Sequence, residues 1–285
     1  MPKNPPQYLV LAAVLFTSSS SIFIRLSIMP PLVLAFYRMA IATLFMAVPL
    51  IFRKGELRAI SHRDLWLCAL SGLALALHFA TWIASLSMTT VMASTVLVST
   101  SPFFVAAVNA VFFRKRPGKI LLICLGVAFA GTLVITTGAA GGQATLTGNL
   151  LALAGAVSVA FYLIIGQEVR KRVSTAAYAF LVYGASAVFL LAFCLAFFQP
   201  LAPYSVGDFA IVGALAVVCS VGGHTLYNLL LKFHGAFLVS LATLCEPLLA
   251  SLLAMAILSE IPQIQTVLGG AIVIAALAMY IFKNR

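Results

Sequence analysis

The sequence predicts an all-α integral membrane protein with ten transmembrane helices, and three observations support this prediction. First, 63% of the 285 residues are apolar, only 8% are charged, and the mean hydropathy is +1.14. A water-soluble domain has about a quarter of its residues charged, so this composition excludes one. Second, the apolar residues lie in segments of about 20, the length of one helix across a bilayer. Third, the charges alternate between these segments as a multi-span protein requires.

Hydropathy and turn residues place the spans in order along the chain. The expected spans are 8–28, 32–52, 66–86, 91–113, 120–138, 148–166, 176–198, 209–231, 236–258 and 264–282. Turn-forming residues lie before several of them, namely Pro30-Pro31, Pro117-Gly118, Gly141-Gly142, Pro200 to Pro203 and Gly235. The connections are short, and none is large enough to form a soluble domain.

The Lys and Arg residues predict which side of the membrane each connection faces. If the N-terminus is cytoplasmic, all of the 17 Lys and Arg except Arg25 and Arg38 lie in inside segments. The outside loops then carry only the acids Asp208 and Glu260. This positive-inside pattern predicts a multi-pass protein of the cell inner membrane with both termini in the cytoplasm. It also explains the net charge of +11 without any nucleic-acid partner.

An internal repeat divides the chain into two halves, 1–139 and 140–285. Pro102 recurs as Pro247, 145 positions later, in the corresponding span of the second half. Each half holds five expected spans, and because five is odd the second half enters the membrane inverted. Inverted repeats of this kind recur in secondary transporters, in which exchanging the conformations of the halves moves the opening from one side to the other.

The chain resembles the drug/metabolite transporter superfamily, specifically the EamA-type ten-span transporters. The likeness rests on four stretches: Ala35-Phe36-Tyr37-Arg38, Ser101-Pro102-Phe103-Phe104, Gly148-Asn149-Leu150-Leu151-Ala152-Leu153, and Glu246-Pro247-Leu248-Leu249 with Ser259-Glu260-Ile261-Pro262. The chain departs from the family at Phe16-Thr17, where members often have Trp-Gly, and at Lys115, where they often have an acid. The resemblance implies a pathway between the halves and the export of small metabolites, among which amino acids are a common substrate class. The chain is similar in this respect to bacterial exporters of amino acids and aromatic metabolites.

Other functions fit the sequence less well. An antiporter of cationic drugs is the main alternative, but small four-span relatives of that kind use a Glu in span one, and span one here has no acid. A passive channel remains open. An enzyme is not expected, since there is no His-Glu-x-x-His motif, and no phosphate-binding loop of a pump occurs. We expect no cofactor and no metal, a lipid bilayer and a small-molecule substrate as partners, and protons as an open question.

Two polar helix faces are the main candidates for a substrate site. Span three carries His78, Thr81, Trp82 and Ser85 at helical spacing, and span eight carries His224, Tyr227 and Asn228. Trp82 and Tyr227 are also 145 positions apart, so they occupy equivalent places in the two halves. Such faces line a pathway or hold helices together by hydrogen bonds, and the sequence leaves both interpretations open.

Further candidates lie in spans one, four and nine. Thr17 and Ser21 are one turn apart in a run of five small hydroxyl residues, which either face the pathway or bond back to their own helix. Pro102 and Pro247 each remove a helical hydrogen bond near mid-span, so each predicts either a hinge or broken helix that lines the cavity or a static kink. Ser99 would lie beside the first of them.

Two charged residues inside expected spans complete the prediction. Glu246 is the only acid deep in the membrane by this map, and it is a candidate proton or ammonium site or a local partner for the backbone freed by Pro247. Arg38 either reaches outward to the interface, pairs with an acid, or attracts a substrate carboxylate. We expect substrate to bind between spans three and eight, with spans one, four, six and nine around it. The small residues of span ten permit a weak homodimer, and a monomer is equally consistent.

Overall fold

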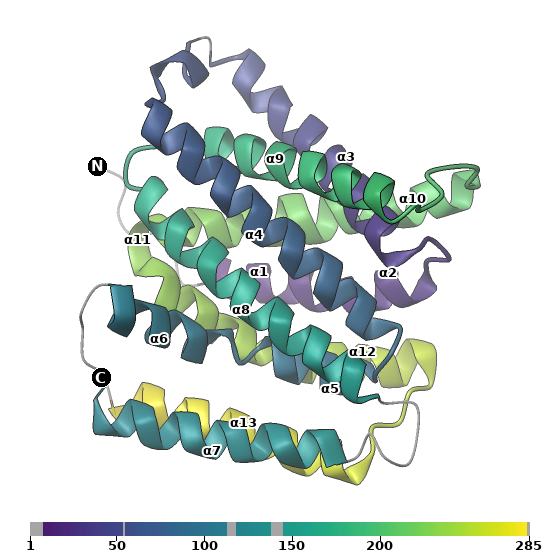
Figure 1. Ribbon diagram of the computed structural model, residues 1–285, viewed down its shortest axis with the longest axis vertical. Coiled ribbons are helices and arrows are strands. Elements are labelled where there is room, and N and C mark those ends of the chain that lie inside the picture. The colour runs from purple at the N-terminus through teal and green to yellow at the C-terminus, as the bar shows by residue number, and fades with distance from the viewer. Residues whose placement is uncertain (1–7, 54, 113–117, 138–144, 284–285) are drawn as a thin grey trace.

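The computed structural model describes residues 8–53, 55–112, 118–137 and 145–283, and the regular elements within them are all helical (Figure 1). The elements are α1 Tyr8–Ser18, α2 Ser20–Leu26, α3 Pro31–Ile51, η1 Leu57–Ala59, α4 His62–Leu86, α5 Val91–Val98, α6 Ser101–Phe112, α7 Lys119–Thr137, α8 Leu146–Val169, α9 Thr175–Ala196, α10 Val206–Ala214, η3 Leu215–His224, α11 Thr225–Ala242, η4 Thr243–Cys245, α12 Glu246–Leu258 and α13 Ile264–Lys283. Seven helical segments are long and apolar enough to cross a membrane, and three shorter apolar helices accompany them. Together these segments coincide with the expected spans, which confirms the predicted fold class.

Helix pairing follows the symmetry expected of two inverted halves. Spans two and seven pack together as α3 and α9, spans four and nine as α5 and α12, and spans five and ten as α7 and α13. Span three packs on span six as α4 on α8, and span eight packs on span one as η3 and α11 on α1. Two such pairs are expected because exchanging the halves turns spans three and six into spans eight and one. In Figure 1, α7 and α13 lie side by side along one edge of the bundle, away from α3 and α9.

Short polar side chains fix where several helices begin. The hydroxyls of these capping residues accept a hydrogen bond from the backbone N–H three residues later, which satisfies a donor that the first helical turn leaves unpaired. The capping residues are Ser61, Thr90, Thr145, Ser174 and Ser205, at the starts of α4, α5, α8, α9 and α10. The capping residues that precede the apolar runs therefore account for the positions at which these five helices begin.

The two membrane prolines follow interruptions of their spans, which is the broken-helix alternative that the sequence left open. Span four is interrupted between Val98 and Ser101, and Pro102 is the second residue of the helix that follows. Span nine has a short 3₁₀ segment, and Pro247 is the second residue of α12. In the first turn of a helix the missing N–H of proline costs nothing, because that N–H would have no helical partner. The spans are therefore broken before the prolines instead of bent at them.

Span eight is irregular as well. After α10 the chain forms a π-helix, η3, before returning to α-helix at Thr225. The following element continues to Ala242 through Gly235, whose φ of 76° and ψ of 167° are non-helical. This glycine is the boundary between the predicted spans eight and nine. The chain is thus irregular at three places within spans four, eight and nine, besides the boundary at Gly235.

We name the two ends of the bundle by their chemistry. The basic end is where α3 ends and α4 begins, and it also holds the start of α1 and the end of α13 (Figure 1). The opposite end holds the α2–α3 and α12–α13 connections. Arg172 at the basic end contacts Asp64 at 2.7 Å and Glu168 at 3.2 Å, and these carboxylates raise the pKa of its guanidinium.

Candidate functional site

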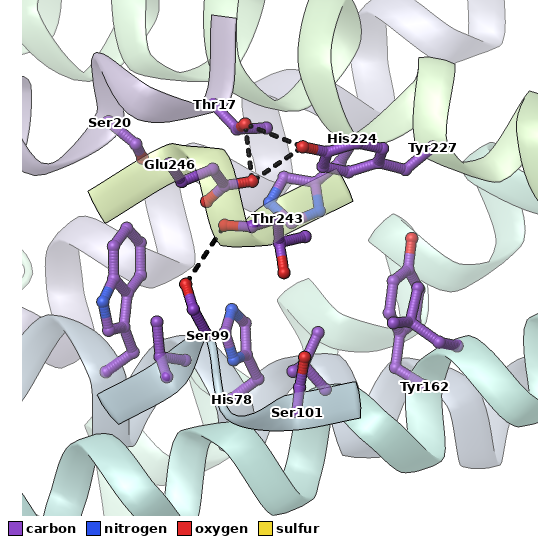
Figure 2. A pocket seen from close by; sticks show the side chains of 14 residues that line it. Thr17, Ser20, His78, Ser99, Ser101, Tyr162, His224, Tyr227, Thr243 and Glu246 are labelled. Carbon is purple, nitrogen blue, oxygen red and sulfur yellow. Dashed lines mark hydrogen bonds between the residues drawn. The ribbon is translucent and has the colours of Figure 1, made fainter. Parts of the chain in front are cut away.

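A polar cavity lies at the centre of the bundle. It has a volume of about 50 Å³, room for a few water molecules. Its walls come from spans one, three, four, six, eight and nine, the six spans expected around the site. The lining residues are Thr17, Ser20, His78, Trp82, Val98, Ser99, Ser101, Val159, Tyr162, Leu163, His224, Tyr227, Thr243 and Glu246. Figure 2 shows the polar members facing one another from opposite walls.

Glu246 is held in this cavity by two hydroxyl groups. Its Oε1 accepts hydrogen bonds from Tyr227 at 2.7 Å and from Thr17 at 2.8 Å, and these two hydroxyls lie 3.2 Å apart (Figure 2). Its other oxygen, Oε2, has no hydrogen-bond partner among the described residues. No Lys or Arg lines the cavity. The carboxylate is therefore oriented by neutral donors from spans one and eight, and one of its oxygens is free for a ligand.

Aromatic rings form the wall that faces the carboxylate. The His78 and Trp82 rings stack with centroids 5.8 Å apart and planes 8° apart, and His224 lies edge-on to His78 at 6.5 Å. His78 Nδ1 lies 3.0 Å from the carbonyl oxygen of Gly155. Because a carbonyl only accepts, this bond fixes the proton on Nδ1 and leaves Nε2 of the neutral ring as an acceptor.

Two polar atoms of this wall are buried without a partner among the described residues, namely Trp82 Nε1 and His224 Nδ1. Buried polar groups are normally hydrogen-bonded, and each exception calls for an explanation. Both atoms belong to residues that line the cavity, so a bound ligand or water would satisfy them. Spans three and eight thus contribute unsatisfied groups as well as ring surface.

Arg38 does not lie where a substrate carboxylate could reach it. Its side chain is fully buried, its Nε donates to Ser220 at 2.8 Å, its Nη1 donates to Ser20 at 3.1 Å, and its guanidinium lies 4.1 Å from the centre of the Phe79 ring. It does not line the cavity. In this conformation Arg38 is held by Ser20, Ser220 and Phe79 outside the cavity wall, so this geometry does not support a direct contact with a substrate carboxylate.

Four other candidates also lie outside the cavity wall. Thr81 bonds back to Leu77, and Ser21 bonds back to Ser18. Ser85 reaches Ser94 at 2.6 Å and so joins α4 to α5. Asn228 accepts from Tyr162 at 2.5 Å, behind the cavity. For these residues the structure favours local bonding and helix–helix contact, the alternatives left open by the sequence.

Several lining residues were not among the substrate-site candidates named from the sequence, although Ser101 lies beside Pro102 and Ser20 belongs to the hydroxyl run of span one. Ser101 and Thr243 lie at the helix breaks, where Ser99 donates to the carbonyl oxygen of Thr243 at 3.1 Å and links spans four and nine. Tyr162 comes from span six, and Ser20 comes from span one. The helix breaks before Pro102 and Pro247 could have indicated the first two. Nothing in the local pattern distinguishes Tyr162 from an interfacial tyrosine.

A set of contacts around Glu260 joins helices at the opposite end of the bundle. Glu260 Oε1 accepts from the backbone N–H of Val91 at 2.6 Å, and Glu260 Oε2 lies 3.4 Å from Arg25. Arg25 also donates to the carbonyl oxygen of Thr89 at 2.8 Å. These bonds join the end of span one, the start of span four and the α12–α13 connection. We call them the Glu260 contacts.

A bundle of apolar spans around a buried polar cavity defines a multi-pass membrane protein. Residues 5–137 and 146–282 match the EamA-like transporter family, and the chain belongs to that family. It is 25% identical over 289 residues to a protein of Archaeoglobus fulgidus described as an uncharacterized transporter, with 99% of each chain covered. A solved structure, titled only as a crystal structure of a protein, matches with a TM-score of 0.69 at 17% identity, covering 97% of this chain and 96% of that one. This last likeness concerns the fold alone. The protein is therefore a membrane transporter of small molecules.

Proposed function

We propose that the protein exports small metabolites, most simply amino acids, across the bacterial inner membrane by alternating access, as a secondary transporter without enzymatic activity. The central cavity supports this proposal because it lies between the halves 1–139 and 140–285 and combines a carboxylate, aromatic rings and hydroxyls. A substrate ammonium would meet Glu246, and an apolar side chain would pack on Trp82 and His78. The positive-inside charges support cytoplasmic termini, which places the basic end on the cytoplasmic side.

Thr17 supplies a reason for treating Glu246 as a group that exchanges a proton or an ammonium. The single Thr17 hydroxyl proton has competing acceptors, the carbonyl oxygen of Ala13 at 2.9 Å and the Glu246 carboxylate at 2.8 Å. With an ionised carboxylate, Thr17 donates to Glu246. With a protonated carboxyl, Thr17 turns to Ala13 and accepts from Glu246. Both charge states of Glu246 are therefore accommodated by one hydroxyl rotation.

An organic-cation antiporter is the second candidate, and one observation favours it. Glu246 is the only Asp, Glu, Lys or Arg lining the described cavity, so a substrate carboxylate would find no opposite charge there. An amino acid would instead rely on the unpartnered Trp82 Nε1 and His224 Nδ1 for its carboxylate. Comparing amino acids with amines of the same side chain separates the two candidates.

The test is flux into proteoliposomes that contain the purified protein, with a panel of amino acids and matched amines, with and without a pH gradient. We expect saturable flux for members of the panel, and at least a tenfold loss in Glu246→Gln and in the double variant His78→Ala/Trp82→Ala. Ser158→Ala, at a half-buried position of α8 where the hydroxyl donates to the Ala154 carbonyl oxygen of its own helix, is the matched control and should retain flux.

Each failure has its own meaning. Undiminished saturable flux in well-folded His78→Ala/Trp82→Ala protein would disprove the cavity as the substrate site. Transport of amines alone would replace the amino-acid proposal by the cation proposal. Glu246→Gln flux that keeps the wild-type response to the pH gradient would show that this carboxyl does not exchange protons.

A further inference from the structure

A second pocket, at the basic end of the bundle, carries positive charge. It lies between the end of α3, the start of α9 and α11, with a volume of about 580 Å³. Arg53, Arg170 and Lys232 line it together with the hydroxyls of Ser174 and Thr175. Its remaining walls are apolar or neutral: Met46, Ala176, Thr225, Leu229 and Phe233. We call it the basic pocket, and it shares no residue with the central cavity.

Arg170 is the most informative residue of the basic pocket. It is 2% exposed, and its guanidinium donates only to neutral acceptors: the carbonyl oxygens of Asn228 and Val173 and the hydroxyl of Thr175. Its hydrogen bonds are thus satisfied by neutral groups, and it makes no ion pair within 4.0 Å in the described part of the chain; Glu56 is the acid that acts on its charge. A buried charge without a counter-charge is costly, so an anion nearby would stabilise this arrangement.

The other two cations are available for that anion. Lys232 makes no ion pair within the described part of the chain, and Arg53 has one partner, Glu56, at a distance of 3.8 Å. Three cations thus face one acid around the basic pocket. The adjacent Lys171 and Arg172 differ, because both pair with the exposed Glu168. The pocket therefore differs from its immediate neighbours Lys171 and Arg172 in the balance of its charges.

We infer that the basic pocket binds a phosphate group with net negative charge, supplied by the headgroup of an anionic phospholipid. Basic pockets between membrane helices at the end facing an anionic leaflet suit such headgroups. The neutral and apolar walls, Met46, Leu229 and Phe233, suit the glycerol and the first acyl carbons. Free phosphate has the same anionic chemistry without the apolar portion, and the test separates the two sources. The inference does not depend on which substrate the central cavity carries.

The test measures thermal unfolding of the full chain in phosphatidylcholine nanodiscs, with phosphatidylglycerol or inorganic phosphate added in separate arms, and counts retained lipids by native mass spectrometry. Phosphatidylglycerol should raise the wild-type Tm by several degrees, and Arg53→Gln/Lys232→Gln should lose most of that shift. Lys171→Gln is the matched control, a nearby cation that does not line the pocket, and should keep the shift.

Other outcomes are equally decisive. If Arg53→Gln/Lys232→Gln unfolds at the wild-type temperature in phosphatidylcholine alone, the variant is folded and its lost response reports binding. An equal response to phosphatidylglycerol in both proteins, or none in the wild type, overturns the lipid site. If inorganic phosphate alone reproduces the shift and the variant abolishes it, the pocket binds free phosphate and the lipid source is wrong.

Discussion

At the scale of single residues, buried polar groups have two distinct uses in this chain. Glu246, Trp82 and His224 have atoms left open to the central cavity, whereas Asn228 uses its side chain to connect tyrosines behind it. The sequence identified both kinds by spacing on a helix, which reports which residues share a face. Spacing does not report which neighbouring helix that face meets, so Asn228 and Trp82 were indistinguishable before the fold was known.

Asn228 allows a prediction about stability. It accepts from Tyr162 at 2.5 Å and donates to Tyr183 at 3.4 Å, so Asn228→Leu leaves two buried tyrosine hydroxyls without this partner. We expect the free energy of unfolding to fall by about 1–3 kcal/mol, since that is the cost of unsatisfied buried groups. Thermal unfolding in detergent measures it. Ser158→Ala should change it little, and an equal loss in both variants would contradict the role given to Asn228.

Tyr227 allows a second prediction, about flux. Tyr227→Phe removes one of the two hydroxyls that donate to Glu246 and keeps the ring. A hydrogen bond to a charged group contributes about 1.5–3 kcal/mol, so the pH at which flux is half-maximal should move upward. Loss of a donor to the ionised form makes that form less favourable, which fixes the sign. A pH profile of proteoliposome flux measures the shift, and an unchanged midpoint would rule out Glu246 as the titrating group.

At the scale of elements, the sequence predicted the helices better than their interruptions. Apolar runs bounded by Ser, Thr, Pro and Gly residues located each span because caps and turn residues act locally. Pro102 and Pro247 located two irregular places, although the break precedes each proline. The π-helix η3 had no sequence signal, since its extra residue per turn depends on how span one packs against it.

Gly235 provides a test at this scale. Its φ of 76° and ψ of 167° fall in a backbone region almost restricted to glycine, and an added Cβ would lie 3.2 Å from Gln167 Oε1. Gly235→Ala should therefore lower the free energy of unfolding by about 1–3 kcal/mol. Gly213→Ala, in α10 with open space around it, should be neutral or stabilising. Equal effects in the two variants would argue against the break at Gly235.

At the scale of the whole molecule, hydropathy and charge were sufficient to predict the membrane-spanning helices, and the division into inverted halves stays a prediction from the internal repeat. Hydropathy and charge were insufficient for Arg38, which the sequence associated with substrate. Its position depends on three other spans, which supply Ser20, Phe79 and Ser220, and no local pattern encodes such a meeting. Likewise, Gly269 and Gly270 of span ten pack within the chain, against Gly131 and Val96, whereas Ala271 and Ala275 are exposed. No local pattern separates the glycines that pack inside the chain from the alanines that do not.

The Glu260 contacts predict how access changes. Glu260→Gln removes the ion pair with Arg25 and weakens the bond to the Val91 N–H, so the opposite end should open more often. In a Cys245→Ser background, an impermeant maleimide added at that end should label Ser99→Cys severalfold faster. Glu168→Gln, which removes the exposed pairs with Lys171 and Arg172, should leave the rate unchanged. Identical rates in all three proteins would refute this closure.

Equivalent backbone amides at the two ends of the bundle bind side chains of different charge. The amide of Val91 meets a carboxylate, and the amide 145 positions later, that of Ala236, meets the neutral side chain of Gln167 at 2.6 Å. An anion at a helix start is favoured by the helix dipole, typically by about 0.3–1 kcal/mol, whereas a neutral amide gains less. Under the proposed alternating access, this difference between a carboxylate and a carboxamide predicts that one of the two end states is the more stable. In the absence of substrate, we expect most molecules to be closed at the opposite end, where the Glu260 contacts lie, and to open at the basic end.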